Sequence, residues 1–158
     1  MEATLKEISI RQLGKNETIP WELLLDADPS MDAISKYLDS SEIYIALLNE
    51  RVIAILVLYP QDEDTVEIKN IAVEERLQNK GIGRLLLDNA MQIALSKGVK
   101  KIIIGTSNAS IAQLYLYQKS GFEITGIKHN FFLDNYPEPI FENGIQCKHM
   151  IMLTKQLK

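Results

Sequence analysis

The sequence predicts an α/β protein built on a mixed sheet of about seven strands, mostly antiparallel, flanked by four helices. Three apolar runs, 42–48, 52–59 and 66–73, follow one another with short polar connections, a pattern typical of an antiparallel meander. From residue 82 to residue 94, apolar residues recur at spacings of three and four, which predicts an amphipathic helix. The short apolar run 101–105 then indicates a strand that is covered on both faces.

The first forty residues predict one strand and two helices. Apolar and polar residues alternate over 5–13, which favours a strand. A helix is expected at Pro20, because proline suits the first helical turn, and Thr18 is its expected N-cap. A second helix follows, with either Ser30 or Asp32 as the cap.

The second half of the chain alternates helices with strands. The long helix is expected to end at Gly98, since glycine adopts the left-handed conformation common just after a helix. A shorter helix is expected over 110–120, closed by Gly121, and strands over 122–127 and 148–157. The predicted order is β-α-α-β-β-β-α-β-α-β-β.

Length and composition indicate a single globular domain over residues 1–158. No apolar run approaches the ~18 residues of a membrane span, and the N-terminus lacks the apolar region of a signal peptide. Cys147 is the only cysteine and cannot form an internal disulfide, so we expect a cytoplasmic protein. A net charge of −4 argues against nucleic acid as a partner and is compatible with a cationic substrate such as an amine.

A glycine-containing loop before the long helix is the strongest functional signal. Gly81 and Gly83 let the backbone approach a ligand closely, and the free N–H groups of a first helical turn suit a phosphate. Leu86 stands where a dinucleotide fingerprint needs its third glycine, and no P-loop Gly-Lys-Ser/Thr follows. The loop instead reads Gln78-x-x-Gly81-x-Gly83.

A second motif follows in the order and at the spacing that a known family shows. The segment from Asn108 to Phe122 ends in Tyr117-Gln-Lys-Ser-Gly121-Phe122. Together the two motifs resemble the GCN5-related N-acetyltransferases (GNAT) over roughly residues 42–153. Within that family the chain looks most like the ribosomal-protein and peptide N-terminal acetylating branch and like uncharacterised small acetyltransferases of Gram-positive bacteria.

The resemblance implies a sheet whose central strands splay to admit the pantetheine arm of acetyl-CoA. The loop backbone would hold the pyrophosphate, with Lys80 or Arg84 adding charge, and the Gln78 side chain would either contact phosphate or brace the loop. Main-chain groups of Ile71 and Val73 would pair with the pantetheine, their side chains being core. The residues expected to bind the cofactor are Ile71, Ala72, Val73, Gln78, Asn79, Lys80, Gly81, Ile82, Gly83, Arg84 and Asn108.

The same resemblance places a candidate general acid at Tyr117, four residues before Gly121. A phenol can return a proton to a thiolate or hydrogen-bond to its sulfur. The alternative is an aromatic packed in the core, and Tyr115 is the local competitor, expected as core or substrate wall. Asn108 lies nine residues before Tyr117 where seven is usual, so either Asn108 or Ser110 could contact the cofactor.

Glu67 is the candidate general base, on the strand before the expected splay. A carboxylate there could deprotonate an amine, most simply through water; the alternative is a strand glutamate paired with Lys69. His129 and His149 have no ligand-like spacing, so no metal site is expected.

These observations predict an acetyl-CoA-dependent N-acetyltransferase that acetylates a primary amine of a small molecule or peptide. Direct attack in a ternary complex is expected, because no cysteine nucleophile lies near the motifs. A catalytically silent acyl-CoA-binding regulatory module is the alternative, and a homodimer through the C-terminal strands is possible.

Overall fold

A computed structural model describes residues 5–157 and places seven strands in one sheet. The order across this sheet is β1-β2-β3-β4-β5-β9-β6, and only the β4–β5 pair is parallel. The predicted mixed, mostly antiparallel sheet is confirmed. Its strands are β1 (Ser9–Gln12), β2 (Glu42–Leu48), β3 (Arg51–Pro60), β4 (Thr65–Val73), β5 (Lys101–Ser107), β6 (Glu123–Lys128) and β9 (Met150–Gln156).

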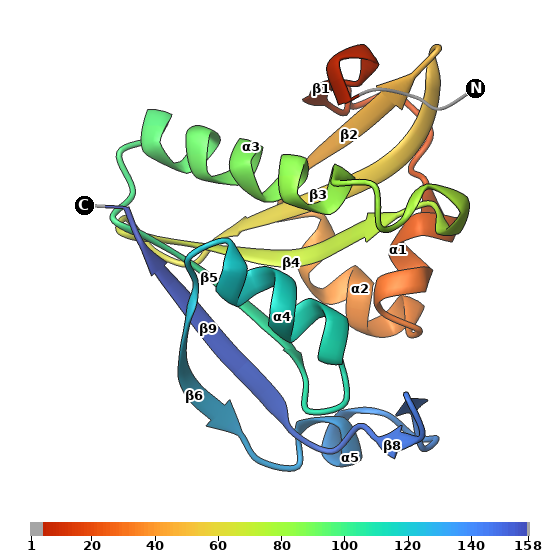
Figure 1. Cartoon of the computed structure of the whole chain (residues 1–158), viewed down its shortest axis with the longest axis vertical. Helices are drawn as coiled ribbons and strands as arrows, with labels where there is room; N and C mark the ends of the chain where they lie inside the picture. Colours follow the sequence, from red (N-terminus) through yellow and green to blue (C-terminus); the bar gives the residue numbers. More distant parts are fainter. Residues whose placement is uncertain (1–4, 158) are drawn as a thin grey trace.

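Helices cover both faces of the sheet (Figure 1). The helices α1 (Trp21–Ala27) and α2 (Met31–Leu38) pack on one face, and α3 (Ile82–Ser96) with α4 (Ile111–Lys119) packs on the other. A fifth helix, α5 (Phe131–Asn135), lies beside the small hairpin of β7 (Phe141–Glu142) and β8 (Ile145–Gln146) at one end of the molecule (Figure 1).

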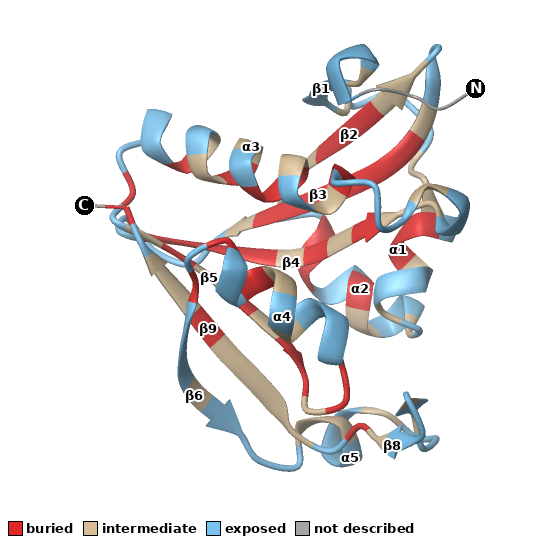
Figure 2. Cartoon of the chain, viewed as in Figure 1, coloured by how far each residue is buried: buried red, intermediate tan, exposed pale blue. Residues whose placement is uncertain are grey.

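The central strand β3 shows why both layers form. Its side chains alternate between the two cores: Leu56 belongs to the core under α3, while Ile55 and Val57 belong to the core under α1 and α2. All three are fully buried, as the continuous red stretch of β3 shows (Figure 2). A strand buried on both faces reads as an unbroken apolar run, which is the pattern of residues 52–58.

The parallel pair β4–β5 is short. Residues Thr65 to Ile68 pair with Lys101 to Ile104, and no pair is recorded beyond Ile68–Ile104. The two strands nevertheless continue, β4 to Val73 on β3 and β5 to Ser107 on β9. The sheet therefore opens between β4 and β5 at this point, which leaves one edge of each strand without a strand partner.

Several local expectations were wrong. The first strand is shorter than predicted, because a 3-10 turn (Leu5–Glu7) precedes it. Pro20 rather than Thr18 occupies the N-cap of α1, and it makes no side-chain cap bond.

For α2, the structure decides between the two expected caps in favour of Ser30, since the Ser30 hydroxyl accepts from the Ala33 N–H at 3.1 Å. The helix α5 and the β7–β8 hairpin are additional to the predicted elements. Within residues 5–157, no helix is long and apolar enough to cross a membrane.

Candidate functional site

The N-terminus of α3 presents free backbone donors. Gly81 is the N-cap in a left-handed conformation, with φ of 90°, and the first helical bond runs from the Leu85 N–H to the Gly81 carbonyl at 3.1 Å. No described residue accepts a hydrogen bond from the N–H groups of Ile82, Gly83 or Arg84. Three donors at the positive end of a 15-residue helix form a favourable site for an anion.

The loop before Gly81 is held from inside. The Gln78 side-chain amide donates to the Val73 carbonyl at 3.0 Å, so in this structure Gln78 braces the loop against the end of β4. Asn79 is itself left-handed, with φ of 62°. Lys80 is exposed, and Arg84 is exposed beside Asp88, with Nε 3.3 Å from a carboxylate oxygen. Both positively charged side chains therefore lie at the protein surface, where they can contact a ligand bound at the loop.

The two helices of the α3–α4 face meet close to this loop. A β-carbon on Gly83 would lie 3.2 Å from a methyl carbon of Leu116 in α4, which is tighter than ordinary packing. Gly83 thus lets the start of α3 approach α4. The Ile82 side chain is buried in the core, so only its backbone can face a ligand.

Beyond the opening of the sheet, β4 offers an unpaired strand edge next to the loop. Ile71 and Val73 direct partly buried side chains toward the α3-side core, whereas Ala72 belongs to the core under α1 and α2. The Ile71 and Val73 side chains, predicted as core, pack against the α3-side core but are only partly buried. Their main chain lies where β5 no longer pairs with β4, at the edge where an extended ligand can add hydrogen bonds.

Tyr117 lies in the core between α4 and the sheet. Its side chain is 4% exposed and its ring centroid lies 6.2 Å from that of Phe122. Burial, and secondly the charge of Glu142, raise the pKa of Tyr117 well above that of a free phenol, so the hydroxyl keeps its proton at neutral pH. No described residue hydrogen-bonds to this hydroxyl. Tyr115 is 65% exposed, which rules out the core alternative for it, and its role as a substrate wall stays a prediction.

The side chains of Asn108 and Ser110 both form hydrogen bonds with the β7–β8 hairpin or the residues directly after it. The Asn108 side-chain oxygen accepts from the N–H groups of Lys148 at 2.8 Å and His149 at 2.9 Å, and its amide donates to the Gln146 carbonyl. The Ser110 hydroxyl donates to Glu142 at 2.8 Å. In this structure the two side chains therefore connect the segment 142–149 to the residues between β5 and α4.

Glu67 lies on the other face of β4 from Tyr117. Its neighbours Val66 and Ile68 belong to the α3-side core, so the alternation of the strand turns Glu67 toward the α1–α2 side. The side chain is buried, accepts a hydrogen bond from the Gln61 amide, and lies 3.4 Å from the Lys69 ammonium. The ion pair with Lys69 is thus present, with the Glu67 side chain buried and the Lys69 side chain partly exposed.

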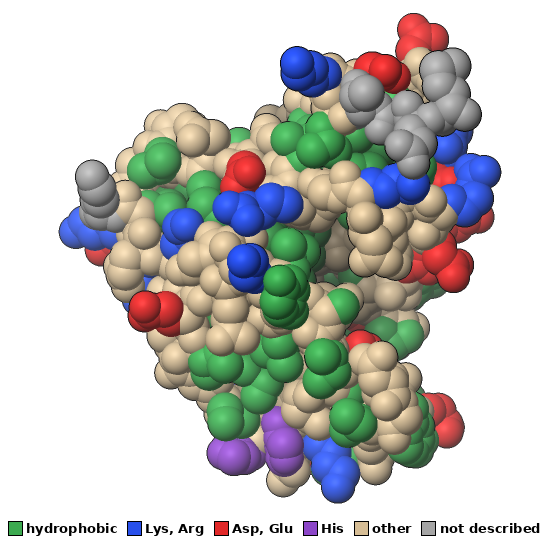
Figure 3. All heavy atoms as spheres, viewed as in Figure 1, with side chains coloured by type: hydrophobic (Ala, Val, Ile, Leu, Met, Phe, Trp, Pro, Cys, Tyr) green, Lys and Arg blue, Asp and Glu red, His purple; other side chains and the backbone are tan. Residues whose placement is uncertain are grey.

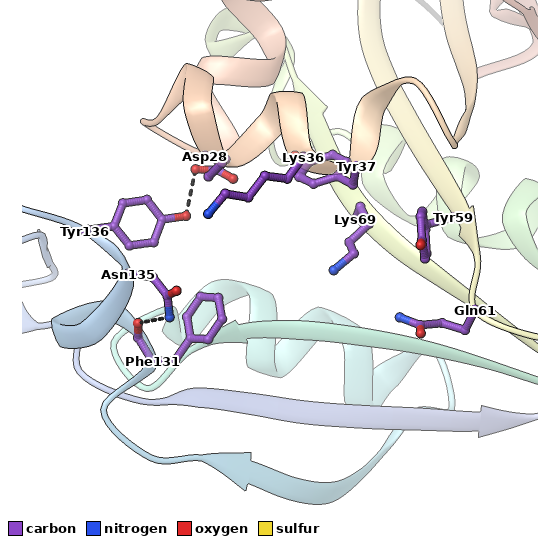
Figure 4. A pocket seen from close by; sticks show the side chains of 10 residues that line it. Asp28, Lys36, Tyr37, Tyr59, Gln61, Lys69, Phe131, Asn135 and Tyr136 are labelled. Atoms are coloured by element: carbon purple, nitrogen blue, oxygen red, sulfur yellow. Dashed lines mark hydrogen bonds between the residues drawn. The ribbon is translucent and has the colours of Figure 1, made fainter.

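A cavity of about 400 Å³ opens on this second face (Figure 4). Its walls come from α1–α2, from β3–β4 and from α5, and they include the rings of Tyr37, Tyr59, Phe131 and Tyr136. A smaller adjoining cavity shares Asp28, Lys69, Phe131 and Tyr136 with the first and adds Glu67 and Gly105. Lys69 and Gly105 are the residues directly after the last paired rung, so the cavities reach the opening of the sheet.

Charged groups in the larger cavity were not identified as site residues from the sequence. The Asp28 carboxylate accepts from the Tyr136 hydroxyl at 2.8 Å and from the Ser30 N–H at 3.2 Å. Burial raises the pKa of Asp28, while these bonds and Lys69 oppose the rise. The ammonium groups of Lys36 and Lys69 point into the cavity (Figure 4), the latter 5.7 Å from the Tyr37 ring centroid and 5.8 Å from that of Tyr59. The three aromatic residues of the 131–136 segment, Phe131, Phe132 and Tyr136, were the available sequence signal.

The remaining chemistry-bearing side chains lie apart from this arrangement. The rings of His129 and His149 contact each other edge to face, with their centroids 5.3 Å apart, and lie together at one end of the molecule (Figure 3). The described residues hold no cluster of metal-ligating side chains. Cys147 is buried beside Glu142, and its burial raises the pKa of the thiol.

Comparison with known proteins is consistent with this geometry. Residues 8–122 match the family model of the acetyltransferase (GNAT) family. The chain is 50% identical over 137 residues to the uncharacterised N-acetyltransferase YvbK of Bacillus subtilis, covering 87% of this chain and 88% of that protein.

Two solved structures extend the comparison. A GNAT family acetyltransferase from Elizabethkingia anophelis, solved with acetyl-CoA bound, superposes with a TM-score of 0.93 at 54% identity, covering 95% of this chain and 98% of the other. The ribosomal-protein-S18-alanine N-acetyltransferase of Escherichia coli superposes with a TM-score of 0.76 at 17% identity, covering 96% and 94%, and shares the fold alone.

Proposed function

The chain belongs to the acetyltransferase (GNAT) family, and from that membership we propose that it is an acetyl-CoA-dependent N-acetyltransferase. Its acceptor is a primary amine of a small molecule or a peptide, and the amine attacks directly in a ternary complex. The observation that carries the proposal is the trio of free N–H groups that follows Gly81, next to the unpaired edge of β4.

These features fit two parts of acetyl-CoA, the pyrophosphate and the pantetheine arm. The N–H groups of Ile82, Gly83 and Arg84 suit a pyrophosphate, with Lys80 and Arg84 within reach as additional cations. The main chain of Ile71 to Val73 suits the amide groups of the pantetheine arm, which would run along the edge of β4 toward the opening of the sheet. Acetyl-CoA bound to the Elizabethkingia protein supports this assignment.

Glu67 and Tyr117 take complementary roles in this proposal. Acetyl-CoA supplies an acetyl thioester whose carbon–sulfur bond breaks as the amine nitrogen takes the acetyl group. Glu67, which faces the cavity at the opening of the sheet, accepts a proton from the incoming ammonium, directly or through water. The Tyr117 hydroxyl is protonated in the resting protein, and it donates a hydrogen bond or its proton to the departing sulfur from the opposite face.

The position of Cys147 favours direct attack over a covalent relay. A nucleophilic cysteine needs a thiolate, which requires a lowered pKa and access to the substrate. Cys147 is 2% exposed, its pKa is raised by burial, and it lines neither of the two cavities.

Release of the free CoA thiol, measured with acetyl-CoA and a panel of amines and peptides, tests the proposal. A functional transferase releases thiol only when a suitable amine is present. If acetyl-CoA binds in a calorimetric titration and no amine stimulates release, the chain is a catalytically silent acyl-CoA-binding module. Acetyl-CoA binding by itself is expected under both interpretations, so the amine-dependent release decides between them.

A homodimer through the C-terminal strands is a separate part of the proposal. The strand β6 forms one edge of the sheet, and it exposes Ile124 by 52% and Ile127 by 49%. Exposed apolar residues on a sheet edge favour pairing with a second chain. Sedimentation velocity of the protein and of the variant Ile127→Lys measures this: a dimer that the variant dissociates supports the edge contact, and a monomer in both cases rejects it.

A further inference from the structure

The two cavities on the α1–α2 face contain more positive than negative side chains. Lys36, Lys69 and Lys128 line them from α2, β4 and β6, against the carboxylates of Asp28 and Glu67. This local excess is opposite in sign to the net charge of −4 of the whole chain. A substrate that carried only an ammonium group would meet this excess unfavourably.

The negative groups are largely engaged by the protein. Asp28 accepts hydrogen bonds from Tyr136 and Ser30. Glu67 is engaged with Gln61 and Lys69. Among residues 5–157, no carboxylate lies within ion-pair distance of the Lys36 ammonium, which points into the larger cavity (Figure 4). Lys36 is therefore available for an anionic group of a ligand.

The distance between Glu67 and Lys69 indicates how an acceptor can be oriented. The Glu67 carboxylate and the Lys69 ammonium lie 3.4 Å apart, where β4 and β5 part. In an α-amino acid the amine and the carboxylate are joined to one carbon atom, so the two groups can contact adjacent partners of opposite charge at the same time. The amine then lies beside the candidate base, and the carboxylate lies toward Lys69 and Lys36.

The rest of the cavity suits the remainder of such a molecule. Phe131 and Tyr136 provide apolar ring surface in the cavity, with the Lys128 ammonium 5.8 Å from the Phe131 ring centroid. The volume of about 400 Å³ is near the lower end of small-ligand pockets. We propose that the acceptor is an α-amino acid or a close analogue, whose carboxylate is bound by Lys36 and Lys69. The inference rests on the proposed acetyl transfer and narrows its acceptor.

The test compares each proteinogenic L-amino acid with its carboxamide. The carboxamide keeps the α-amine and the side chain and removes only the negative charge. For the best acceptor, the amino acid is expected to exceed its carboxamide about tenfold in kcat/KM for CoA release, as charge-assisted hydrogen bonds allow. The substitution Lys36→Gln is expected to raise the KM of the amino acid about tenfold and to bring the ratio of kcat/KM between amino acid and carboxamide closer to one. Lys36→Arg, which keeps the positive charge, is expected to restore the low KM of the amino acid.

Lys119→Gln is the matched control, because Lys119 is an exposed lysine on α4 outside both cavities. Equal use of amino acid and carboxamide, or a better use of amidated peptides, overturns the inference and leaves the transferase in place. Calorimetric titration of the same pairs in the presence of CoA separates the two proposals. If an amino acid binds in a way that depends on Lys36 but no thiol is released, the carboxylate site is supported and the transferase proposal is overturned. If there is no binding and no release, both proposals are overturned.

Discussion

The Tyr136 hydroxyl donates a hydrogen bond of 2.8 Å to the Asp28 carboxylate, joining segments 108 residues apart in the sequence. Asp28 follows α1 and Tyr136 follows α5, so this bond connects the two walls of the larger cavity (Figure 4). Both groups are about half-buried. The cavity therefore depends on a tertiary contact between the N-terminal helices and the segment after β6.

Replacing Tyr136 with phenylalanine tests this contact. Loss of a hydrogen bond to a charged group is expected to lower the free energy of unfolding by about 1–2 kcal/mol, measured by urea denaturation near neutral pH. Tyr59→Phe, at a cavity tyrosine without such a bond, is the control. An unchanged unfolding free energy together with an unchanged acceptor KM would show that the bond does not organise the cavity.

The loss of stability caused by Tyr136→Phe is expected to depend on pH, and the sign of this dependence follows from the pKa of Asp28. Burial raises the pKa of Asp28, so its contribution to stability is largest below its ordinary value of 3.8 and is lost as the pH rises through the folded-state pKa. The Tyr136 bond opposes that rise, so Tyr136→Phe raises the pKa further. The destabilisation by Tyr136→Phe is therefore expected to be larger near pH 7 than below pH 3.8, and equal destabilisation at both would contradict this account.

Gly81→Ala is expected to weaken acetyl-CoA binding about tenfold or more, measured by calorimetry. The φ of 90° strains any residue with a β-carbon, and that atom would lie 3.3 Å from Leu5, so the loop is expected to shift from the conformation that leaves its N–H groups free. Gly98→Ala is the matched control: it carries the same kind of strain, with φ of 75°, at the far end of α3. Equal affinity in both variants would reject the phosphate-loop assignment.

Local sequence patterns were sufficient for the main elements and for the glycine-started beginning of α3. The meander and α3 follow from hydrophobic periodicity over seven or more residues, and Gly81 has a conformation that its local sequence already favours. The five-residue helix α5 and the two-residue strands β7 and β8 are too short to show a period. Their positions depend instead on tertiary bonds such as those made by Asn108.

The larger cavity on the α1–α2 face was beyond sequence reasoning for a related reason. Asp28, Lys36, Lys69 and Tyr136 come from four separate segments, and each residue alone resembles an ordinary surface or loop residue. Only the folded chain brings them together. The sequence also suggested Glu67 and Tyr117 as candidate base and acid without placing them relative to each other, and strand alternation directs Glu67 to the face opposite Tyr117.

Glu67→Gln tests the general base while keeping the size of the side chain. Turnover is expected to fall about 10²-fold, because the amide cannot accept the proton of the ammonium, while acetyl-CoA affinity stays within about twofold. Glu42→Gln is the control, since Glu42 is likewise paired with a lysine, Lys97 at 2.8 Å, but lies on β2 and on the α3 face of the sheet, opposite to Glu67. Unchanged kcat in Glu67→Gln would reduce Glu67 to a structural ion pair with Lys69.

Asn108→Ala distinguishes a brace from a cofactor contact. The substitution leaves the N–H groups of Lys148 and His149 without their acceptor, and it is expected to cost about 2–3 kcal/mol of unfolding free energy. If the side chain acts only as a brace, acetyl-CoA affinity changes little at temperatures where the variant remains folded. A large loss of affinity with unchanged stability would instead support direct cofactor contact.

Tyr117→Phe separates a proton donor from a core aromatic. The hydroxyl receives no hydrogen bond from a described residue, so its removal is expected to leave the unfolding free energy within about 1 kcal/mol of the parent. Turnover is nevertheless expected to fall about 10²-fold, because the protonated phenol is the group proposed to stabilise the departing sulfur. Tyr115→Phe, at the exposed neighbour, should leave kcat unchanged. Full activity in Tyr117→Phe would assign Tyr117 to the core, where its packing against Phe122 already places its ring.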